Sequence, residues 1–353
     1  MDVREFDFDL PPELIAQQPT PDRASARLLY VDRAARSLTH SRVTALPGLL
    51  RSGDLLVVNN TRVFPARLLG HRVPSGGAVE CLLVRELESE GSDPSNCYEA
   101  LMHPGQKLHP GARVMFDGTH AIHGEVLQQR FFGRRVIRLW TDDGTPLANA
   151  IDAIGHVPLP PYIKRADEAP DHARYQTVFA RERGSVAAPT AGLHFTPELI
   201  AALRARGVDM AEITLHVGYG TFQPVRVDRV EDHRIEPEHY EITDGSAGTI
   251  NRALDDDRRV IAVGTTTTRT LEAVAASHDG RIAAGAGTTD LFIYPGFAFR
   301  VIRGLLTNFH MPRSSLLMLV AAFGGRELVK TAYDAAIRER YWFYSYGDAM
   351  LLL

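Results

Sequence analysis

Three histidines and one aspartate are the residues of this sequence best suited to acid–base chemistry. His194 ends the run "GSVAAPTAGLH", His216 lies in "TLHVGYGTF", Asp290 in "TTDLFIYPG" and His310 in "LLTNFHMP". Small residues let the backbone come close to a ligand, and an imidazole or a carboxylate can exchange a proton with it. One such histidine is more often structural, but three of them, each expected just after the end of a separate strand of the sheet, favour a catalytic site.

The elements that must hold these side chains are predicted from about residue 150 onward, where strands and helices alternate. Such alternation predicts a mainly parallel sheet or barrel, whose active site lies at the carboxyl ends of the strands. The predicted helices cover 197–207, 314–323 and 326–340, with a helix after the turn "VGTTTT"; the predicted strands are 210–217 and those in "RRVIAV", "TDLFIYPG" and "GLLTNFHMP". The Gly-Thr turn can bind a phosphate or carboxylate at a helix N-terminus, or serve only as a helix cap.

The segment between the first predicted strand and residue 150 has a different sequence pattern. Leu55 to Val58 is an apolar run typical of a buried strand, and Asn59-Asn60 signals a turn after it. Six short runs then follow between about 66 and 141, separated by glycine and proline, which predicts an antiparallel barrel or sandwich. The polar stretch "ESEGSDPSN" (88–96) is the expected hairpin tip. We predict a discontinuous α/β domain (1–65 and 150–353) interrupted by a β domain (66–149).

Composition excludes several classes of protein. Of the 353 residues 44% are hydrophobic and 23% charged, and the net charge of −4 argues against nucleic-acid binding through bulk charge. No apolar run reaches the roughly 20 residues of a membrane-spanning helix. Cys81 and Cys97 form no disulfide framework, so we expect a cytoplasmic protein. An RNA partner would need a local basic face, and the candidate has seven basic residues: Arg300, Arg303, Arg313, Arg326, Lys330, Arg338 and Arg340.

Familiar catalytic and cofactor motifs are missing. "GAGTTD" lacks the last glycine of a dinucleotide fingerprint, and there is no GxxxxGK[ST], GxSxG or HExxH. His233 and His239 are interleaved with acids and a proline, which favours a surface turn over a metal site. We expect no metal.

Several long motifs nevertheless occur in order along the whole chain. They include "GDLLVVNNTRVFPARL", "GHVPLPPYIKR", "GSVAAPTAGLHFT", "TLHVGYGTFQPV", "VGTTTTRTLE", "LLTNFHMPRSSLLMLVAAF" and "YSYGDAMLL". As a set they resemble the S-adenosylmethionine:tRNA ribosyltransferase-isomerase family of the queuosine pathway. One position departs from the family pattern, because Trp342 stands where an arginine is usual. A tryptophan there can still stack on a base.

The resemblance implies a fold and a reaction. The fold is a large α/β domain of distorted-barrel type interrupted by a small antiparallel β-barrel. The reaction moves the ribosyl part of S-adenosylmethionine onto 7-aminomethyl-7-deazaguanine at the wobble position of tRNA, giving epoxyqueuosine-tRNA, adenine and methionine. No cofactor is expected, since S-adenosylmethionine is consumed as a substrate, and we expect a monomer that binds an anticodon loop and no membrane.

The resemblance also suggests roles for the candidate residues. His194, His216, Asp290 and His310 are the expected acid–base groups, with His194 the first choice for removing a C5′ proton. The expected substrate-binding residues are Thr190, Gly192, Tyr219, Phe222, Thr265, Thr266, Phe292, Tyr294, Asn308 and Tyr346. The expected RNA-binding residues are Lys164, Arg165, Arg300, Arg303, Arg313, Arg338 and Arg340. No basic and aromatic stripe is evident in the inserted domain, so its role in RNA binding stays open.

Two rival hypotheses keep the same sequence features but change the activity. In the first, the chain is an RNA-binding module whose histidines only position a loop. In the second, it is a metal-dependent hydrolase that uses His194, His216 and His310.

Overall fold

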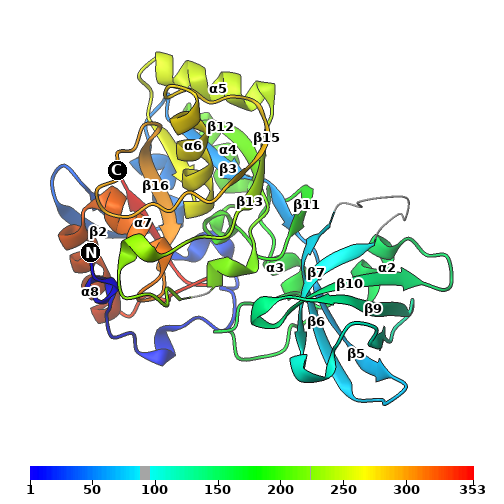
Figure 1. Cartoon of the computed structure of the whole chain (residues 1–353). Coiled ribbons are helices and arrows are strands. Elements are labelled where there is room, and N and C mark those ends of the chain that lie inside the picture. The colour runs from blue at the N-terminus through cyan, green and yellow to red at the C-terminus, as the bar shows by residue number, and fades with distance from the viewer. Residues whose placement is uncertain (88–95, 223) are drawn as a thin grey trace.

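The computed structural model describes residues 1–87, 96–222 and 224–353, and it has two lobes (Figure 1). The larger lobe is built on a nine-stranded sheet, and the smaller lobe is a closed barrel. The predicted α/β class with an inserted antiparallel barrel is confirmed. The predicted hairpin tip at 88–96 lies outside the described residues except for residue 96.

The large sheet has four parallel strands at its centre. Its order is β15 (Gly285–Thr289), β13 (Glu238–Ile242), β12 (Asp209–Leu215), β3 (Leu55–Asn59), β14 (Val260–Val263), β16 (Ile302–Asn308), β17 (Ala349–Leu352), β1 (Arg27–Asp32) and β2 (Ser37–Arg42). Strands β12, β3, β14 and β16 run parallel, so their carboxyl ends meet at one edge. The barrel-like closure expected for the large domain does not form among the described residues, because the edge strands β15 and β2 each pair on one side only.

Alternate residues of the buried strands explain why helices cover both faces of this sheet. Leu55 and Val57 pack into one core cluster, and Leu56 and Val58 pack into another. On the first side lie α5 (Asp244–Asp255), α6 (Thr265–Ser277), α7 (Ser315–Gly324) and α8 (Arg326–Arg338); on the second lie α1 (Leu46–Leu49) and α4 (Pro197–Ala205). A strand buried on both faces has no polar side, which is why the run at 55–58 is continuously apolar.

The smaller lobe closes in the order β10, β7, β6, β5, β8, β9. Its strands are β5 (Arg67–Val73), β6 (Ala78–Glu86), β7 (Cys97–His103), β8 (Arg113–Phe116), β9 (Ile122–Gln129) and β10 (Arg134–Thr141). All six predicted strands are confirmed, and every neighbouring pair is antiparallel. Helix α2 (Leu147–Ile154) packs Leu147, Ala150 and Ile151 into the barrel core. These strands lie inside the predicted domain 66–149, whose exact limits stay a prediction.

Short elements join the two lobes. A two-stranded sheet pairs β4 (Thr61–Val63) with β11 (Glu182–Ser185), and α3 (Asp171–Arg174) lies close to it in sequence and in Figure 1. The 3₁₀ turns are Val3–Phe6, Pro12–Leu14, Arg23–Ser25, Val43–Ala45, Gly105–Lys107, Phe131–Gly133, Thr190–His194, Tyr219–Phe222 and Val230–Asp232. No helix in the described part of the chain is long and apolar enough to cross a bilayer.

Two local predictions are wrong. The run "TDLFIYPG" is not a strand, because β15 ends at Thr289 and an irregular segment follows it. The segment that ends in His194 does not leave the large sheet, because the strand before it, β11, pairs only with β4. In both cases an apolar or small-residue run was taken for a strand end of the main sheet.

Candidate active site

A cavity lies at the edge of the large sheet where the parallel strands end. It has an empty volume of about 620 Å³ when its open mouth is included. Its wall contains residues that directly follow β14 and β16, together with Thr190, Phe222 and the segment Tyr344–Ser345. The predicted residues that line this cavity are Thr190, Phe222, Thr265, Thr266, Asn308 and His310.

The N-terminus of α6 forms one wall of this cavity. Gly264, the N-cap residue, has a φ of +97°, a conformation that favours glycine. The helix N-terminus therefore has no side-chain cap. The hydroxyls of Thr267 and Thr268 donate within the helix, to Val263 and Gly264 carbonyls. Those of Thr265 and Thr266 make no hydrogen bond in the described residues, so they are available to a ligand beside the helix N-terminus.

His310 is the predicted catalytic residue that lines the main cavity. Its Nε2 lies 2.7 Å from the Thr307 hydroxyl, and its backbone N–H donates to the Tyr333 hydroxyl at 2.9 Å. Burial lowers the pKa of His310 to about 3. The imidazole is therefore neutral at pH 7.

Asn308 links the main cavity to His194. Its side-chain nitrogen donates to the Tyr344 carbonyl at 3.1 Å and approaches His194 Nε2 at 3.3 Å. With both amide protons directed in this way, Oδ1 is fixed as an acceptor, and it is buried without a partner in the described residues. A buried acceptor without a partner is costly, and a ligand donor in the cavity can remove that cost.

His194 lies behind this cavity, in a smaller one. The smaller cavity is lined by Arg23, Arg174, His194 and Tyr346, and Ser345 borders both cavities. Burial, and then the nearby Arg23 guanidinium, lower the pKa of His194 to about 4. Its neutral Nε2 faces Asn308, so the structure places His194 beside a ligand-facing residue and away from the main cavity.

Aromatic rings form the opposite wall. Tyr162 lies 4.6 Å from Tyr344 and 6.0 Å from Phe222, measured between ring centroids, and its hydroxyl lies 2.6 Å from Ser345 Oγ. Tyr344 has a φ of +72°, a strained conformation for a bulky residue and one that tends to occur at functional sites. Sequence reasoning missed Tyr162 and Tyr344, although both lie in the motifs "GHVPLPPYIKR" and "YSYGDAMLL".

The four predicted acid–base residues do not line one cavity: His310 lines the main cavity, His194 lines the smaller one, and His216 and Asp290 line neither. His216 Nδ1 lies 2.8 Å from the Thr61 hydroxyl, and the ring packs against Gly184. Asp290 is exposed just after the edge strand β15. Neither residue lines either cavity. His216 is held where β12 meets the β4–β11 sheet, and Asp290 is displaced because its segment is not a central strand.

Several predicted substrate contacts also lie elsewhere. Phe292 packs against His233 and Tyr294, on the side of the core that holds α5 to α8. Tyr219 packs against Phe222 and the barrel core without reaching the cavity, and Gly192 is buried so closely that a Cβ would lie 2.9 Å from Thr177. Tyr346 lines the smaller cavity and donates to Asp171 at 2.8 Å. These residues support the fold around the site.

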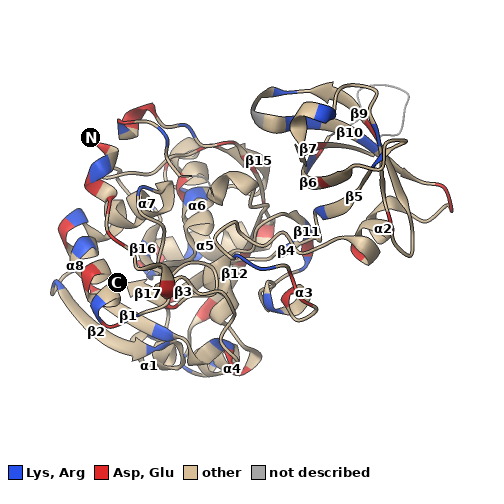
Figure 2. Ribbon diagram, turned by 90° about the horizontal axis from the view of Figure 1, so that it is seen from below, with Lys and Arg blue, Asp and Glu red and all other residues tan. Residues whose placement is uncertain are grey.

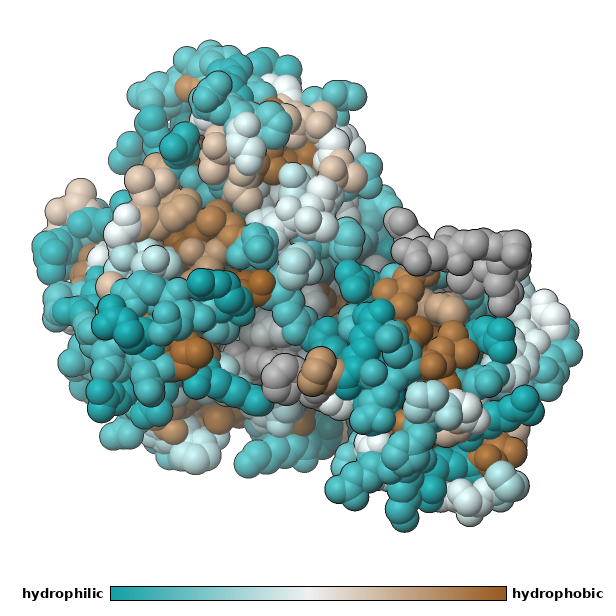
Figure 3. All heavy atoms as spheres, in the orientation of Figure 1, coloured by the Kyte–Doolittle hydropathy of each residue, from teal (hydrophilic) through white to brown (hydrophobic). Residues whose placement is uncertain are grey.

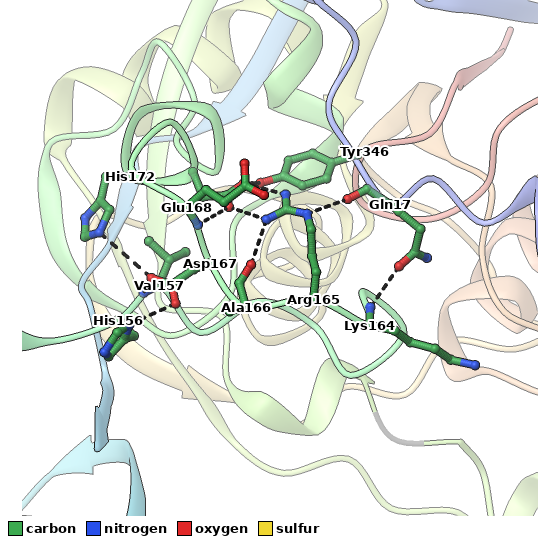
Figure 4. A network of polar contacts seen from close by, with 11 residues as sticks. Gln17, His156, Val157, Lys164, Arg165, Ala166, Asp167, Glu168, His172 and Tyr346 are labelled. Carbon is green, nitrogen blue, oxygen red and sulfur yellow. Dashed lines mark hydrogen bonds and ion pairs between the residues drawn. The ribbon is translucent and has the colours of Figure 1, made fainter. Parts of the chain in front are cut away.

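Lys164 and Arg165, predicted together as RNA contacts, have different surroundings (Figure 4). Arg165 donates to both oxygens of buried Asp171, at 2.6 and 2.9 Å, and to the Gln17 carbonyl at 3.0 Å. The exposed Lys164 side chain points away from this network. Only Lys164 is free to meet RNA, because Arg165 is committed to an internal ion pair.

The other predicted RNA contacts do not form an unopposed basic face. Arg303 lies 2.6 Å from Asp257, and Arg313 is paired with Asp7. Arg338 lies 3.7 Å from Glu339, and Arg340 lies 4.0 Å from Glu13. Arg300 is exposed, and its backbone N–H donates to Glu272. Acidic and basic segments alternate along α8 and across this lobe in Figure 2, and hydrophilic residues cover much of it in Figure 3.

The metal-dependent hypothesis requires three histidines to converge. In the described residues they do not, because His216 contacts Thr61, His310 contacts Thr307 and His194 contacts Asn308. No group of three histidine, cysteine, aspartate or glutamate side chains with metal-binding geometry occurs in the described chain. The geometry therefore does not support that hypothesis.

Comparison with known proteins covers the whole chain. The sequence model of a family described as "Queuosine biosynthesis protein" matches residues 3–352. Proteins named S-adenosylmethionine:tRNA ribosyltransferase-isomerase from Moorella thermoacetica and Solibacter usitatus are 48% and 49% identical over the full length of both chains. A crystal structure of S-adenosylmethionine tRNA ribosyltransferase from Thermotoga maritima is 35% identical, covers 99% of this chain and 100% of that one, and has a TM-score of 0.55.

Proposed function

This chain belongs to the family of queuosine biosynthesis proteins, and we propose that it is a transferase-isomerase that acts on tRNA. It transfers and isomerises the ribosyl group of S-adenosylmethionine onto 7-aminomethyl-7-deazaguanine at the wobble position, with release of adenine and methionine. The observation that carries this proposal is the identity of about half of all positions, end to end, with relatives that bear this activity in their names.

The proposed reaction has two chemical requirements that the main cavity must meet. The sulfonium acidifies the neighbouring C5′ protons, so a neutral base must remove one of them. The attacking amine must be uncharged, although an ordinary amine has a pKa near ~10. A site that excludes water and holds neutral acid–base groups meets both demands.

His310 meets the first demand best. Its imidazole lines the cavity and is kept neutral by burial, so we assign it the role of C5′ base. His194, the first choice from the sequence, is reassigned because it opens on the smaller cavity. Its contact with Asn308 makes it a positioning residue for the free Oδ1 acceptor, which is suited to a ligand N–H.

The remaining walls of the cavity suit different groups of S-adenosylmethionine. Thr265 and Thr266, with the N-terminus of α6, suit the methionine carboxylate or the ribose hydroxyls. Tyr162, Phe222 and Tyr344 can face the sulfonium through their rings, an attraction of about 0.5–2 kcal/mol. No cofactor is needed, because the sulfonium itself provides the leaving group. We propose a monomer in the cytoplasm; sedimentation of the purified protein checks the monomer, and fractionation of cells checks the location.

One assay separates this function from its rivals. The protein is incubated with S-adenosylmethionine and tRNA that carries the 7-aminomethyl-7-deazaguanine base, and released adenine and methionine are quantified. The matched control is the same tRNA with guanine at that position, which should release none. Tight tRNA binding without adenine would support the non-catalytic RNA-binding module instead, and loss of turnover on chelation would support the metal-dependent hydrolase.

A further inference from the structure

The hairpin between β9 and β10 of the barrel exposes an aromatic ring among arginines. Its residues 130–134 read "RFFGR", and the Phe131 residue is 88% exposed. Among the large hydrophobic residues recorded as exposed, the next, Trp342, reaches 44%. Among the described residues of the barrel, no packing contact accounts for a phenylalanine so far out of the core, since burial normally favours this side chain strongly.

Three arginines gather beside this ring on a single carboxylate. Glu99, itself 8% exposed on the side chain, lies 3.1 Å from Arg130, 3.2 Å from Arg134 and 3.5 Å from Arg85. Glu99 and Glu236, which also pairs with Arg134, neutralise two of the three charges, and each guanidinium carries five donors. Positive charge and hydrogen-bond donors are therefore left over at this end of the barrel, where Figure 2 shows basic segments near β7 and β10.

A chain of contacts links the hairpin to the wall of the main cavity. Arg134 forms a second ion pair, with Glu236 of the large domain. Glu236 lies against Gly220, since a Cβ built on that glycine would be 3.7 Å from its carboxylate. The next residue, Thr221, lines the main cavity. The chain of contacts from the hairpin to the cavity wall is thus continuous.

We propose that the β9–β10 hairpin is an RNA-contacting surface, in which Phe131 stacks on an unpaired base and Arg85 and Arg130 hold phosphates. This rests on the proposed function, because the RNA is the tRNA whose modified base enters the cavity. An anticodon loop offers unpaired bases and phosphates a short distance from the reacting base. A protein partner fits less well, since a stable interface needs roughly 800 Å² from each side and this surface has one aromatic ring among charges.

Substitutions of Phe131 test the stacking contact. Binding is measured with the modified tRNA and with its isolated anticodon stem-loop. Phe131→Ala should raise the Kd for both by about 5- to 100-fold, and Phe131→Trp should keep it within about threefold. Phe131→Leu, which keeps an apolar side chain but cannot stack, should behave like the alanine variant. Leu69→Ala is the matched control, since Leu69 is 43% exposed on another strand of the same barrel.

Arg130→Gln tests the phosphate contact. Glu99 keeps Arg85 and Arg134 in this variant, so the barrel should stay folded. The slope of log Kd against log salt should become shallower by about 0.7 to 0.9. Arg281→Gln, just after α6 and paired with Asp255, should leave the slope unchanged.

These measurements separate the two proposals. Binding is read without turnover, so a protein that releases no adenine still reports on the hairpin. The hairpin proposal is overturned if Phe131→Ala and Arg130→Gln bind the modified tRNA like wild type. A change in sedimentation with Phe131→Ala and unchanged RNA affinity would assign the surface to a second copy of the chain instead.

Discussion

The main cavity and the barrel hairpin differ in where they keep their functional groups: the cavity buries them, and the hairpin exposes them. In the cavity, histidines are buried and neutral, and Asn308 is fixed by two internal contacts that leave Oδ1 free. In the hairpin, the Phe131 ring is exposed to solvent. The guanidiniums beside it pair with one buried carboxylate, that of Glu99. The contrast shows that a reaction site is recognised by polar groups left unsatisfied inside the fold. A binding surface is recognised by exposed groups for which the fold has no use.

The largest effect expected from breaking the cavity is on turnover. His310→Ala should lower kcat by a factor of about 100 or more if this imidazole takes a proton in the reaction. Asp290→Asn and His216→Gln are the matched controls, and they should stay within about fivefold, since neither side chain lines the cavity. Adenine release under saturating substrates measures all three. Normal turnover in His310→Ala would return the base to His194.

The second effect separates fold from RNA contact within one dipeptide. Arg165→Ala should destabilise the protein by about 3–5 kcal/mol, because it leaves the buried Asp171 carboxylate without its ion-pair partner. Lys164→Ala should leave the free energy of unfolding unchanged and weaken tRNA binding several-fold. Denaturant titration and tRNA binding give the two readouts. Equal stability of both variants would mean that Arg165 has no structural role.

A smaller effect is expected at the helix N-terminus. Thr266→Val should raise the KM for S-adenosylmethionine about tenfold with little change in kcat, because a hydroxyl that is free in the structure is lost from the cavity. Thr268→Val removes a hydroxyl already bonded within the helix, so its KM should be near that of wild type. Initial rates over a range of S-adenosylmethionine concentrations distinguish them.

The smallest effect is a dependence of stability on pH. Burial holds the pKa of His310 near about 3 and that of His194 near about 4, below the ordinary 6.5. Between the lowered pKa of each histidine and 6.5, the unfolded chain therefore binds more protons than the folded one. The free energy of unfolding is highest above pH 6.5 and decreases as the pH falls. Each histidine should contribute a slope of about 1.4 kcal/mol per pH unit between roughly pH 6 and 4. Denaturation of wild type and His310→Gln should differ by one such slope.

Periodicity and turn residues were enough to predict the barrel and the buried strand β3, because each of these elements is decided locally. His310 and Asn308 could be placed in a site because both end a strand of the central parallel set. Asp290 could not, since only pairing with β13 shows that β15 stops at Thr289. The ion pair of Arg165 with Asp171 and the exposure of Phe131 depend on tertiary packing, which no local pattern reports.

The position of β17 has a consequence for how the protein is made. This strand lies between β16 and β1, and next to it Asp348 binds Arg27 across 321 positions of sequence. During translation the strands β1 and β2 must therefore wait for almost the entire chain before they join the sheet. Tyr344 and Ser345, which border the cavity, come from the same late segment. Strands β1 and β2 therefore join the sheet at the same late stage at which Tyr344 and Ser345 become available to the pocket.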